Sequence, residues 1–356
     1  MERENNIFLQ LCALLLMVAT TSFVFASQSD IDQATRSKVV NAIANKLEAE
    51  YVFPDIGKKM ADTLRAKENE GKYEGISDGG ALSFAFTRHL RELSGDKHIN
   101  VYFEMHRPNM DISAAIRNMA GLRSKKSFDF VKSSSLPGNI ALVELYSFPP
   151  PEIGDDAITK VMNEISETDA LIIDLRNNGG GSPEMVALIS SYLFGEMPVH
   201  LNDLSYRRSS MRKQYWTQTN LAGKRYGLTK PVYVLTSNKT FSAAEEFSYN
   251  LKNLKRATIV GEVTGGGANP GEVFRIDERF SIFIPTGRAI NPITKTNWEG
   301  VGVKPDIEVP RSHALRVFKT LCQKLQFNVS IQSSGKMNRQ LRQRQIPILH
   351  GMRPSL

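Results

Sequence analysis

Cysteine is nearly absent from this chain. Of the 356 residues only two are cysteines, Cys12 and Cys322. We expect Cys12 to be removed with an N-terminal segment, which would leave Cys322 without a partner for an internal disulfide. A cysteine nucleophile would need a motif around it, and a cysteine-based metal site would need further cysteines or histidines at ligand spacing. The sequence supports none of these three uses of cysteine, and no other cluster has the spacing of metal ligands.

Long apolar runs are also missing, except near the N-terminus. Ile7 to Ala19 is apolar, and Val24-Phe25-Ala26 follows it as a small-residue cleavage site. This pattern predicts a secretory signal peptide, residues 1–26, and an exported protein that is periplasmic or secreted. The alternative is an uncleaved anchor, for which the run is short. We therefore expect no membrane span after signal cleavage.

Acidic residues are absent from the C-terminal end. Residues 311–356 contain nine of the 45 Lys and Arg residues and none of the 37 Asp and Glu residues, so the rest of the chain is nearly neutral. No nucleic-acid-binding motif accompanies this charge, and we expect no nucleic acid partner. Apolar periodicity ends after Leu325, which predicts a basic, disordered tail over residues 328–356.

Hydrophobic periodicity divides the remainder into two parts. Residues 27–94 show three apolar helical faces and predict a small helical subdomain. Residues 95–327 alternate strands with helices, which predicts an α/β core. We expect loop-like chain over 105–132 and a polar, irregular lobe over 199–230. The expected strands are 99–103, 138–145, 170–174, 232–236, 257–260 and a hairpin over 274–284.

Ser242 stands where a strand turns into a helix. Val232 to Thr236 is apolar and β-branched, and the helical spacing of Phe247, Leu251 and Leu254 begins just after Ser242. Nucleophilic serines are often displayed in this way, because the free N–H groups at a helix start can bind an oxyanion. The alternative is that Ser242 serves only as the N-cap of the helix.

Four ordered motifs resemble those of the C-terminal processing (tail-specific) serine peptidases. The relatives of that family include the tricorn protease and the repeats of interphotoreceptor retinoid-binding protein. The resemblance covers Ile31 to Leu325 and implies a crotonase/ClpP-like core with Ser242 as the nucleophile. The motifs are Thr240-Phe-Ser-Ala-Ala-Glu-Glu-Phe247, Arg256-Ala-Thr-Ile-Val-Gly-Glu-Val-Thr-Gly-Gly-Gly-Ala268, Asp174-Leu-Arg-Asn-Asn-Gly-Gly-Gly181 and Trp298-Glu-Gly-Val-Gly-Val-Lys-Pro-Asp-Ile307.

The chain departs from the tail-specific branch at two places. About forty residues separate Glu104 from the next predicted strand, too few for the PDZ domain that many of these peptidases carry. The family's catalytic lysine would fall at Gly267, and the segment Thr264 to Pro270 contains no lysine. The first departure argues against carrying over the tail-specific choice of substrate, and the second argues against the family's Ser/Lys dyad. The tricorn-like branch instead uses His with a Glu.

The resemblance then supplies the remaining candidate residues. His98 matches the family's Asp-x-His position and would be the general base, and Glu299 aligns with the tricorn-like glutamate that orients the histidine. Asp96 is a weaker candidate for that second role. From geometry, the oxyanion would be bound by the backbone N–H groups of Ala243 and of the glycine turn, most plainly Gly180.

The sequence therefore predicts an exported serine peptidase that cleaves unstructured peptides or protein tails, without a cofactor or a metal. The alternative is a non-catalytic module that binds apolar, retinoid- or lipid-like ligands on the same fold, because a fold by itself does not decide function. The oligomeric state cannot be read from the residues.

Overall fold

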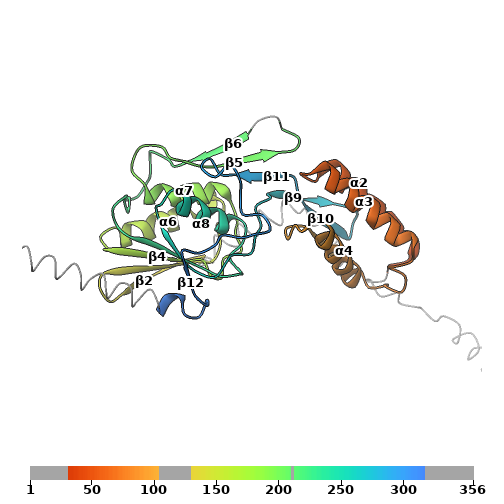
Figure 1. Ribbon diagram of the computed structural model, residues 1–356, viewed down its shortest axis with the longest axis horizontal. Coiled ribbons are helices and arrows are strands. Elements are labelled where there is room, and N and C mark those ends of the chain that lie inside the picture. The colour runs from red at the N-terminus through yellow and green to blue at the C-terminus, as the bar shows by residue number, and fades with distance from the viewer. Residues whose placement is uncertain (1–30, 104–129, 210–211, 317–356) are drawn as a thin grey trace, which may run out of the picture.

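The computed structural model describes residues 31–103, 130–209 and 212–316. The expected signal peptide, most of the 105–132 loop and the 328–356 tail lie outside these ranges. Within them the chain forms two lobes that lie beside one another, one around α2–α4 and one around α6–α8 (Figure 1). No helix in the described ranges combines the length and the apolar character that a membrane span requires.

Three helices open the chain, as the periodicity predicts. Each begins at a residue suited to a helix start: Asp32 and Asp78 accept N–H bonds from the first turns of α2 and α4, and Pro54 opens α3. Gly95 ends α4 in the left-handed conformation at φ 73°. The bounds are Gln33–Glu50 for α2, Pro54–Asn69 for α3 and Gly79–Ser94 for α4.

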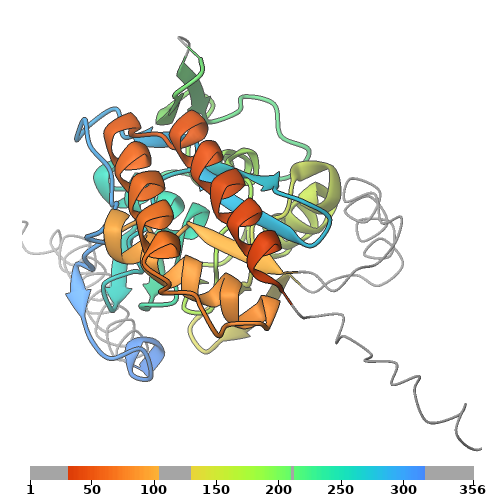
Figure 2. The same cartoon turned by 90° about the vertical axis from the view of Figure 1, so that its right-hand side faces the viewer.

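These helices share their core with strands from two distant parts of the chain. A small antiparallel sheet has the order β1-β10-β9, with β1 at Asn100–Phe103, β10 at Phe280–Pro285 and β9 at Gly271–Arg275. Helix α2 lies across this sheet, and α3 packs beside α2 (Figure 2). Ile282 and Ile284 of β10 pack into one buried cluster with Ile43 and Leu47 of α2. The helical part of the chain is thus completed by strands far away in sequence.

The second lobe is built on a six-stranded sheet of order β12-β8-β7-β4-β3-β2. Its strands are parallel except for the β2–β3 pair. Strand β4 is buried along its whole length, as expected for the centre of such a sheet. The bounds are Val131–Leu136 for β2, Ile140–Leu145 for β3, Ala170–Asp174 for β4, Val232–Thr236 for β7, Thr258–Gly261 for β8 and Ile307–Glu308 for β12.

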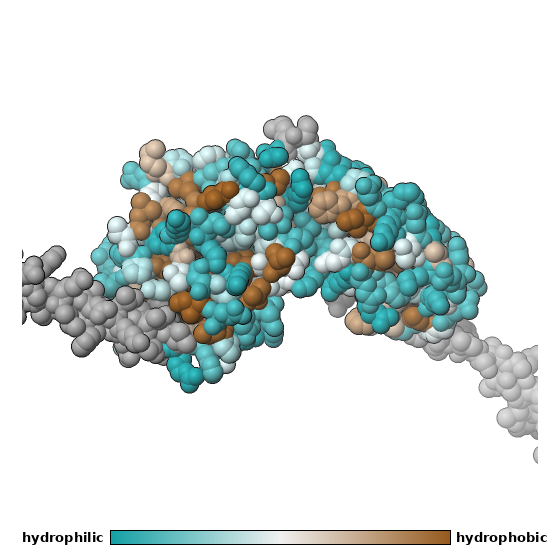
Figure 3. Space-filling model, in the orientation of Figure 1, coloured by the Kyte–Doolittle hydropathy of each residue, from teal (hydrophilic) through white to brown (hydrophobic). Residues whose placement is uncertain are grey.

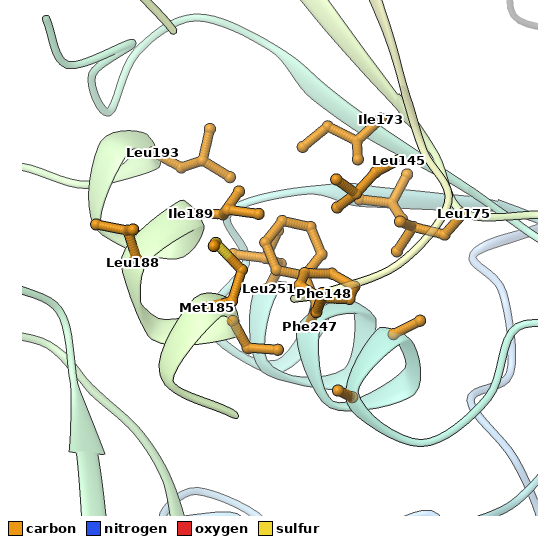
Figure 4. Close-up of a cluster of buried hydrophobic side chains, with 14 of the residues drawn as sticks. Leu145, Phe148, Ile173, Leu175, Met185, Leu188, Ile189, Leu193, Phe247 and Leu251 are labelled. Atoms are coloured by element: carbon orange, nitrogen blue, oxygen red, sulfur yellow. The ribbon is translucent and has the colours of Figure 1, made fainter. Parts of the chain in front are cut away.

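Three helices cover one face of this sheet: α6 at Pro151–Ile165, α7 at Pro183–Leu193 and α8 at Ala243–Asn253. Their apolar side chains meet those of β3 and β4 in one core, where Phe148 and Phe247 lie between the two helices α7 and α8 and the strands (Figure 4). The tight packing fixes the N-terminus of α8, and with it Ser242, above the carboxyl end of the sheet.

The expectation of an irregular lobe over 199–230 was wrong for its first half. Strands β5, His200–Tyr206, and β6, Arg212–Trp216, form a hairpin that joins β11, Gly287–Ile290, in the order β11-β5-β6. Asn202 and Asp203 are buried inside β5 although both are polar. A search for alternating hydrophobic residues therefore does not detect this strand. The predicted hairpin around Asp277 is confirmed as β9–β10.

Candidate active site

Ser242 lies at a sharp turn between β7 and α8. Its backbone has φ 55° and ψ −123°, a conformation that a residue with a side chain seldom adopts. The turn is held from both sides: the Phe241 N–H donates to the Asn178 carbonyl at 3.0 Å, and the Ser242 N–H donates to Glu245 Oε2 at 2.9 Å. A strained serine displayed between a strand and a helix has the local geometry of a nucleophile elbow.

His98 faces this serine from the other lobe. Its Nε2 lies 3.1 Å from Ser242 Oγ, within hydrogen-bond reach. His98 lies in the short segment between α4 and β1, where its own N–H donates to Asp96 Oδ1 at 2.9 Å. The rings of Phe241 and Phe283 flank the imidazole, with centroids 4.6 and 6.0 Å away. The two predicted partners, 144 residues apart in sequence, are therefore adjacent in space.

Gly267, the position of the family's lysine, has no room for a side chain. A Cβ on Gly267 would lie 2.3 Å from Cζ of Phe241 and 2.7 Å from Cε1 of His98. Both contacts are far inside van der Waals distance. The imidazole and the phenyl ring thus occupy the space that a lysine would need, which is a physical reason for glycine at this position.

Two carboxyl groups lie near the other ring nitrogen of His98. Asp96 Oδ1 is 3.6 Å from Nδ1, and Asp96 Oδ2 accepts from Asn269 at 2.9 Å and from the Tyr51 hydroxyl at 3.3 Å. Glu299 Oε2 accepts the Ala268 N–H at 2.5 Å. Nδ1 of His98 and Oε1 of Glu299 are both buried, and neither has a hydrogen-bond partner among the residues that the structure describes. One donor atom from each of Asp96, His98 and Glu299 lies within 4.8 Å of the others.

The two carboxyls differ in their ionisation. Burial raises the pKa of Glu299 to about 7, and the charge of Asp96 adds to the shift. Burial acts on Asp96 as well, but contacts with His98 and Asn269 outweigh it and hold the pKa of Asp96 below its ordinary value. At neutral pH the full negative charge beside His98 therefore lies on Asp96. The sequence assigned no metal here, and we interpret the cluster as electrostatic support for the imidazole of His98.

The two predicted oxyanion donors, the N–H groups of Ala243 and Gly180, both lie beside Ser242 but differ in whether they already donate a hydrogen bond. No hydrogen bond of the described residues takes the N–H of Ala243, as expected in the first turn of a helix. Gly180 approaches Ser242 closely: a Cβ on Gly180 would lie 2.8 Å from the Ser242 Cβ. The Gly180 N–H, however, already donates to Asn178 Oδ1 at 2.8 Å.

The neighbours Gly179 and Gly181 border the cleft in front of Ser242, and in the described part of the chain neither N–H has an acceptor. The glycine turn thus offers N–H groups on either side of the residue that the sequence indicated. Gly180 itself allows the glycine turn to approach Ser242 closely, because any larger residue at this position would push Ser242 away.

The sequence reading missed the part played by Glu245. This buried carboxylate accepts the N–H groups of Gly266 and Gly267 at 2.6 and 2.8 Å, the Thr264 hydroxyl at 2.5 Å and the Ser242 N–H. It ties the glycine loop to the serine turn. The available signal was the spacing Ser-x-x-Glu, which is that of a capping box.

A cleft of about 700 Å³ opens in front of Ser242 and His98, a size usual for ligand sites. Glycines and aromatic rings form much of its wall, and charged side chains border it: Arg91, Lys97, Glu184, Lys213 and Glu246. On the face shown in Figure 3, apolar residues occur in small separate groups among polar ones.

Sequence models of known families match most of the described chain. The model of peptidase family S41 matches residues 139–309, and the model of the N-terminal domain of peptidase S41 in eukaryotic IRBP matches residues 33–129. The chain belongs to peptidase family S41. This is a family of serine-type peptidases, which agrees with the resemblance seen in the motifs.

Two curated relatives are C-terminal processing enzymes. The chain is 28% identical over 201 residues to carboxyl-terminal-processing peptidase 2, chloroplastic, of Arabidopsis thaliana, which covers 53% of this chain and 37% of the relative. It is 27% identical over 179 residues to the carboxy-terminal processing protease CtpA of Bacillus subtilis, and this match covers 49% of this chain and 35% of the relative. The matched segments thus span little more than a third of these relatives.

Solved structures show the same fold. A putative peptidase from Parabacteroides merdae has a TM-score of 0.57 at 18% identity, covering 82% of this chain and 97% of that one. The tricorn protease has a TM-score of 0.51 at 14% identity, covering 82% and 37%. The predicted α/β fold with an N-terminal helical region is confirmed.

Proposed function

We propose that this S41 protein hydrolyses peptide bonds of unstructured peptides or protein tails, with Ser242 as nucleophile and His98 as general base. The observation that carries the proposal is the 3.1 Å contact between Ser242 Oγ and His98 Nε2 at a strained strand-to-helix turn. An N-cap without further function would need neither the strain nor the imidazole.

The geometry supports acyl transfer in two halves. Ser242 Oγ attacks the scissile carbonyl while His98 Nε2 accepts the hydroxyl proton. The oxyanion forms beside the Ala243 N–H and the glycine turn, where free N–H groups stabilise it. His98 then protonates the leaving amine, which departs. Water, deprotonated by His98, attacks the acyl-enzyme and restores Ser242.

The two carboxyls divide the support of the imidazole. Asp96 carries the negative charge that favours an imidazolium during proton transfer, and it is itself held by Tyr51 and Asn269. Glu299 completes the wall behind Nδ1 and is anchored on Ala268. The sequence assigned the orienting role to Glu299, and we now assign it to Glu299 and Asp96 together.

The rival function, binding of an apolar ligand, fits the cleft less well. An apolar ligand would leave the buried Glu246 carboxyl without a polar partner and would cover the charged Glu184–Lys213 pair with hydrocarbon, and both effects cost free energy. A peptide offers N–H and C=O groups and side chains that can pair with them. The mixed polar lining therefore favours a peptide substrate.

Labelling with a fluorophosphonate probe tests the proposal. The probe should label wild-type protein, and peptide mapping should place the adduct on Ser242. Ser242→Ala should lose both the label and the hydrolysis of unstructured peptides, whereas Ser135→Ala, a change at an exposed position on β2, should keep both. An unlabelled wild-type protein that binds retinoids instead would favour the rival function.

We further propose that the protein acts outside the cytoplasm. The support is the sequence alone, the apolar run Ile7 to Ala19 followed by the cleavage-site pattern that ends at Ala26. Cell fractionation with N-terminal sequencing of the purified protein tests this. A mature N-terminus at Ser27 is expected, and a cytoplasmic protein that retains residues 1–26 would contradict it.

A further inference from the structure

Glu246 is a buried carboxyl that the reaction does not use. It lies on α8 four residues after Ser242, so the two residues occupy the same side of the helix, one turn apart. Glu246 is 3% exposed and borders the cleft in front of the serine. Its Oε1 is buried and has no hydrogen-bond partner within the part of the chain that the structure describes. A carboxyl in this state has capacity for a ligand group that enters the cleft.

No cation of the described residues pairs with Glu246. Lys213, on the neighbouring wall, lies 2.6 Å from Glu184, whose carboxylate also accepts from the Tyr215 hydroxyl at 2.9 Å. The other basic groups of the cleft are engaged elsewhere: Arg91 with the Ile99 carbonyl and Lys97 with the Gly265 carbonyl. The Glu184 carboxylate therefore has both an ion-pair partner and a hydrogen-bond donor, whereas the Glu246 carboxyl has no cation beside it in the described chain.

Asn202 of β5 adds unpaired polar atoms beside Glu246. By hydrogen-bond geometry, neither the nitrogen nor the oxygen of its buried side-chain amide has a partner among the described residues, although the amide lies close enough to Glu246 to lower the pKa of that carboxyl. The groups facing Glu246 across the cleft are Glu184, Tyr206 and Tyr215, and none of them is a cation. Burial raises the pKa of Glu246 to about 8, the Asn202 amide beside it offsets only part of this shift, and the charge of Glu184 adds to it. This corner of the cleft is thus acidic, polar and unfilled by the protein itself.

The corner lies on the acyl side of the scissile bond. Glu184 and Pro183 open α7 directly after the glycine turn, so this wall continues from the oxyanion donors. His98 enters from the opposite lobe on the segment before β1, where it would meet the leaving amine. In acyl transfer the carbonyl oxygen points toward the oxyanion donors and the leaving amine toward the base, so we place the acyl residue on the side of the donors. A side chain that reaches Glu246 therefore belongs to the residue that supplies the scissile carbonyl.

We propose that Glu246 forms the floor of the subsite for that residue and selects lysine or arginine there, its carboxylate pairing with the entering cation. The proposal rests on the proposed peptidase function. A long basic side chain reaches one helical turn past the serine, fills the unpaired capacity of Glu246 and Asn202, and brings the charge that the pocket lacks. The entering cation would favour the ionised form of Glu246, and the resulting charge-assisted hydrogen bond is stronger than a neutral one.

Matched peptides that differ only at the residue before the scissile bond test the selection. Arginine and lysine peptides should be cleaved with a kcat/KM about 100-fold above that of a norleucine peptide, the loss typical when a buried charge pair is broken. Glu246→Gln should remove this preference and leave norleucine cleavage and labelling of Ser242 in place. Glu272→Gln, at an exposed position on β9, is the matched control and should keep the preference.

A measurement on the wild-type protein does not depend on how any variant folds. Benzamidine, a small cation, should slow fluorophosphonate labelling of Ser242, and benzamide, its neutral analogue, should not. Equal cleavage of the basic and norleucine peptides, a basic preference that survives in Glu246→Gln, or no difference between benzamidine and benzamide would each overturn the selection by Glu246. In those cases, labelling of Ser242 together with peptide cleavage would still support the proposed peptidase function. If neither labelling nor cleavage is observed, the proposed function itself is wrong.

Discussion

At the scale of single residues, the site depends on the distribution of charge around His98. Two carboxyls lie near Nδ1, and folding lowers the pKa of Asp96 while it raises that of Glu299. Like charges so close cannot both be ionised at low cost, so the better hydrogen-bonded group keeps the charge. At neutral pH, Asp96 is therefore negatively charged and Glu299 is close to half-protonated.

Loss of either reacting group should abolish the activity. Ser242→Ala and His98→Ala should each lower kcat by about a thousandfold or more, because neither group works without the other. The double variant should be no worse than either single one. Steady-state kinetics on an unstructured peptide measure this, with circular dichroism to show that the fold is kept. Full activity in His98→Ala would send the search for a base to the lysines, beginning with Lys239.

Glu299 should impose a pH dependence on stability. Its pKa in the folded protein, about 7, lies above the ordinary value of 4.5, so the folded state holds the proton more tightly. The resulting stabilisation is present below pH 4.5 and is lost as the pH rises from 4.5 through 7. Glu299→Gln should therefore flatten the fall of Tm between pH 5 and pH 8. Thermal denaturation of both proteins at these two pH values measures this difference. An equal fall of Tm in the wild type and in Glu299→Gln would contradict the assignment.

At the scale of elements, the start of α8 holds the site together. The strained turn at Ser242 persists because Glu245 binds both it and the glycine loop, and because Asn178 holds the turn from the sheet side. The loop in turn carries Gly267, which leaves room for His98. Ser242, the proposed oxyanion donors and the proposed base are thus coupled through one buried carboxylate.

Glu245→Ala should accordingly weaken both stability and catalysis. Removing a buried acceptor leaves two N–H groups of the glycine loop and the Thr264 hydroxyl unpaired, each worth ~1–3 kcal/mol when buried. Urea denaturation should show a loss of roughly 3 kcal/mol or more, and kcat should fall even where the protein is folded. Glu152→Gln, in the exposed first turn of α6, is the control. An unchanged midpoint would show that the loop is held by other contacts.

Gly267→Ala should act on the imidazole more than on substrate binding. The new methyl group would meet Phe241 and His98 at contact distances that real atoms do not tolerate. Both rings must move, so the contact with Ser242 Oγ lengthens. We expect kcat to fall by about tenfold or more with a smaller change in KM, since proton transfer depends steeply on geometry. Gly195→Ala, where a Cβ would stay 3.4 Å from its nearest neighbour, is the control.

At the scale of the whole molecule, the site exists only where the lobes meet. His98, Asp96 and Tyr51 come from the N-terminal part, and Ser242 comes from the α/β lobe. Strands β9 and β10 cross from one lobe to the other and fill the core under α2 and α3. A fragment of residues 31–103 would expose that core, so we expect it to show little cooperative unfolding in circular dichroism. A sharp thermal transition for the fragment would show that it folds independently.

Much of this protein is determined locally and can be read from the sequence. Periods of two and of 3.6 residues gave the N-terminal helices and the central strands, because side chains on one face must be buried together. The turn at Ser242 and the missing lysine at Gly267 are likewise visible in the letters. Strand β5 was missed because its buried Asn202 and Asp203 are polar, and only tertiary neighbours make burial of such residues tolerable.

The tertiary structure decided which of these groups act on one another. Sequence spacing does not contain the 3.1 Å contact of His98 with Ser242, the engagement of the Gly180 N–H by Asn178, or the two opposite pKa shifts at Asp96 and Glu299. It equally hid the unpaired carboxyl of Glu246. Burial and electrostatic interaction depend on distances in space, and chain folding sets those distances between residues that are far apart in sequence.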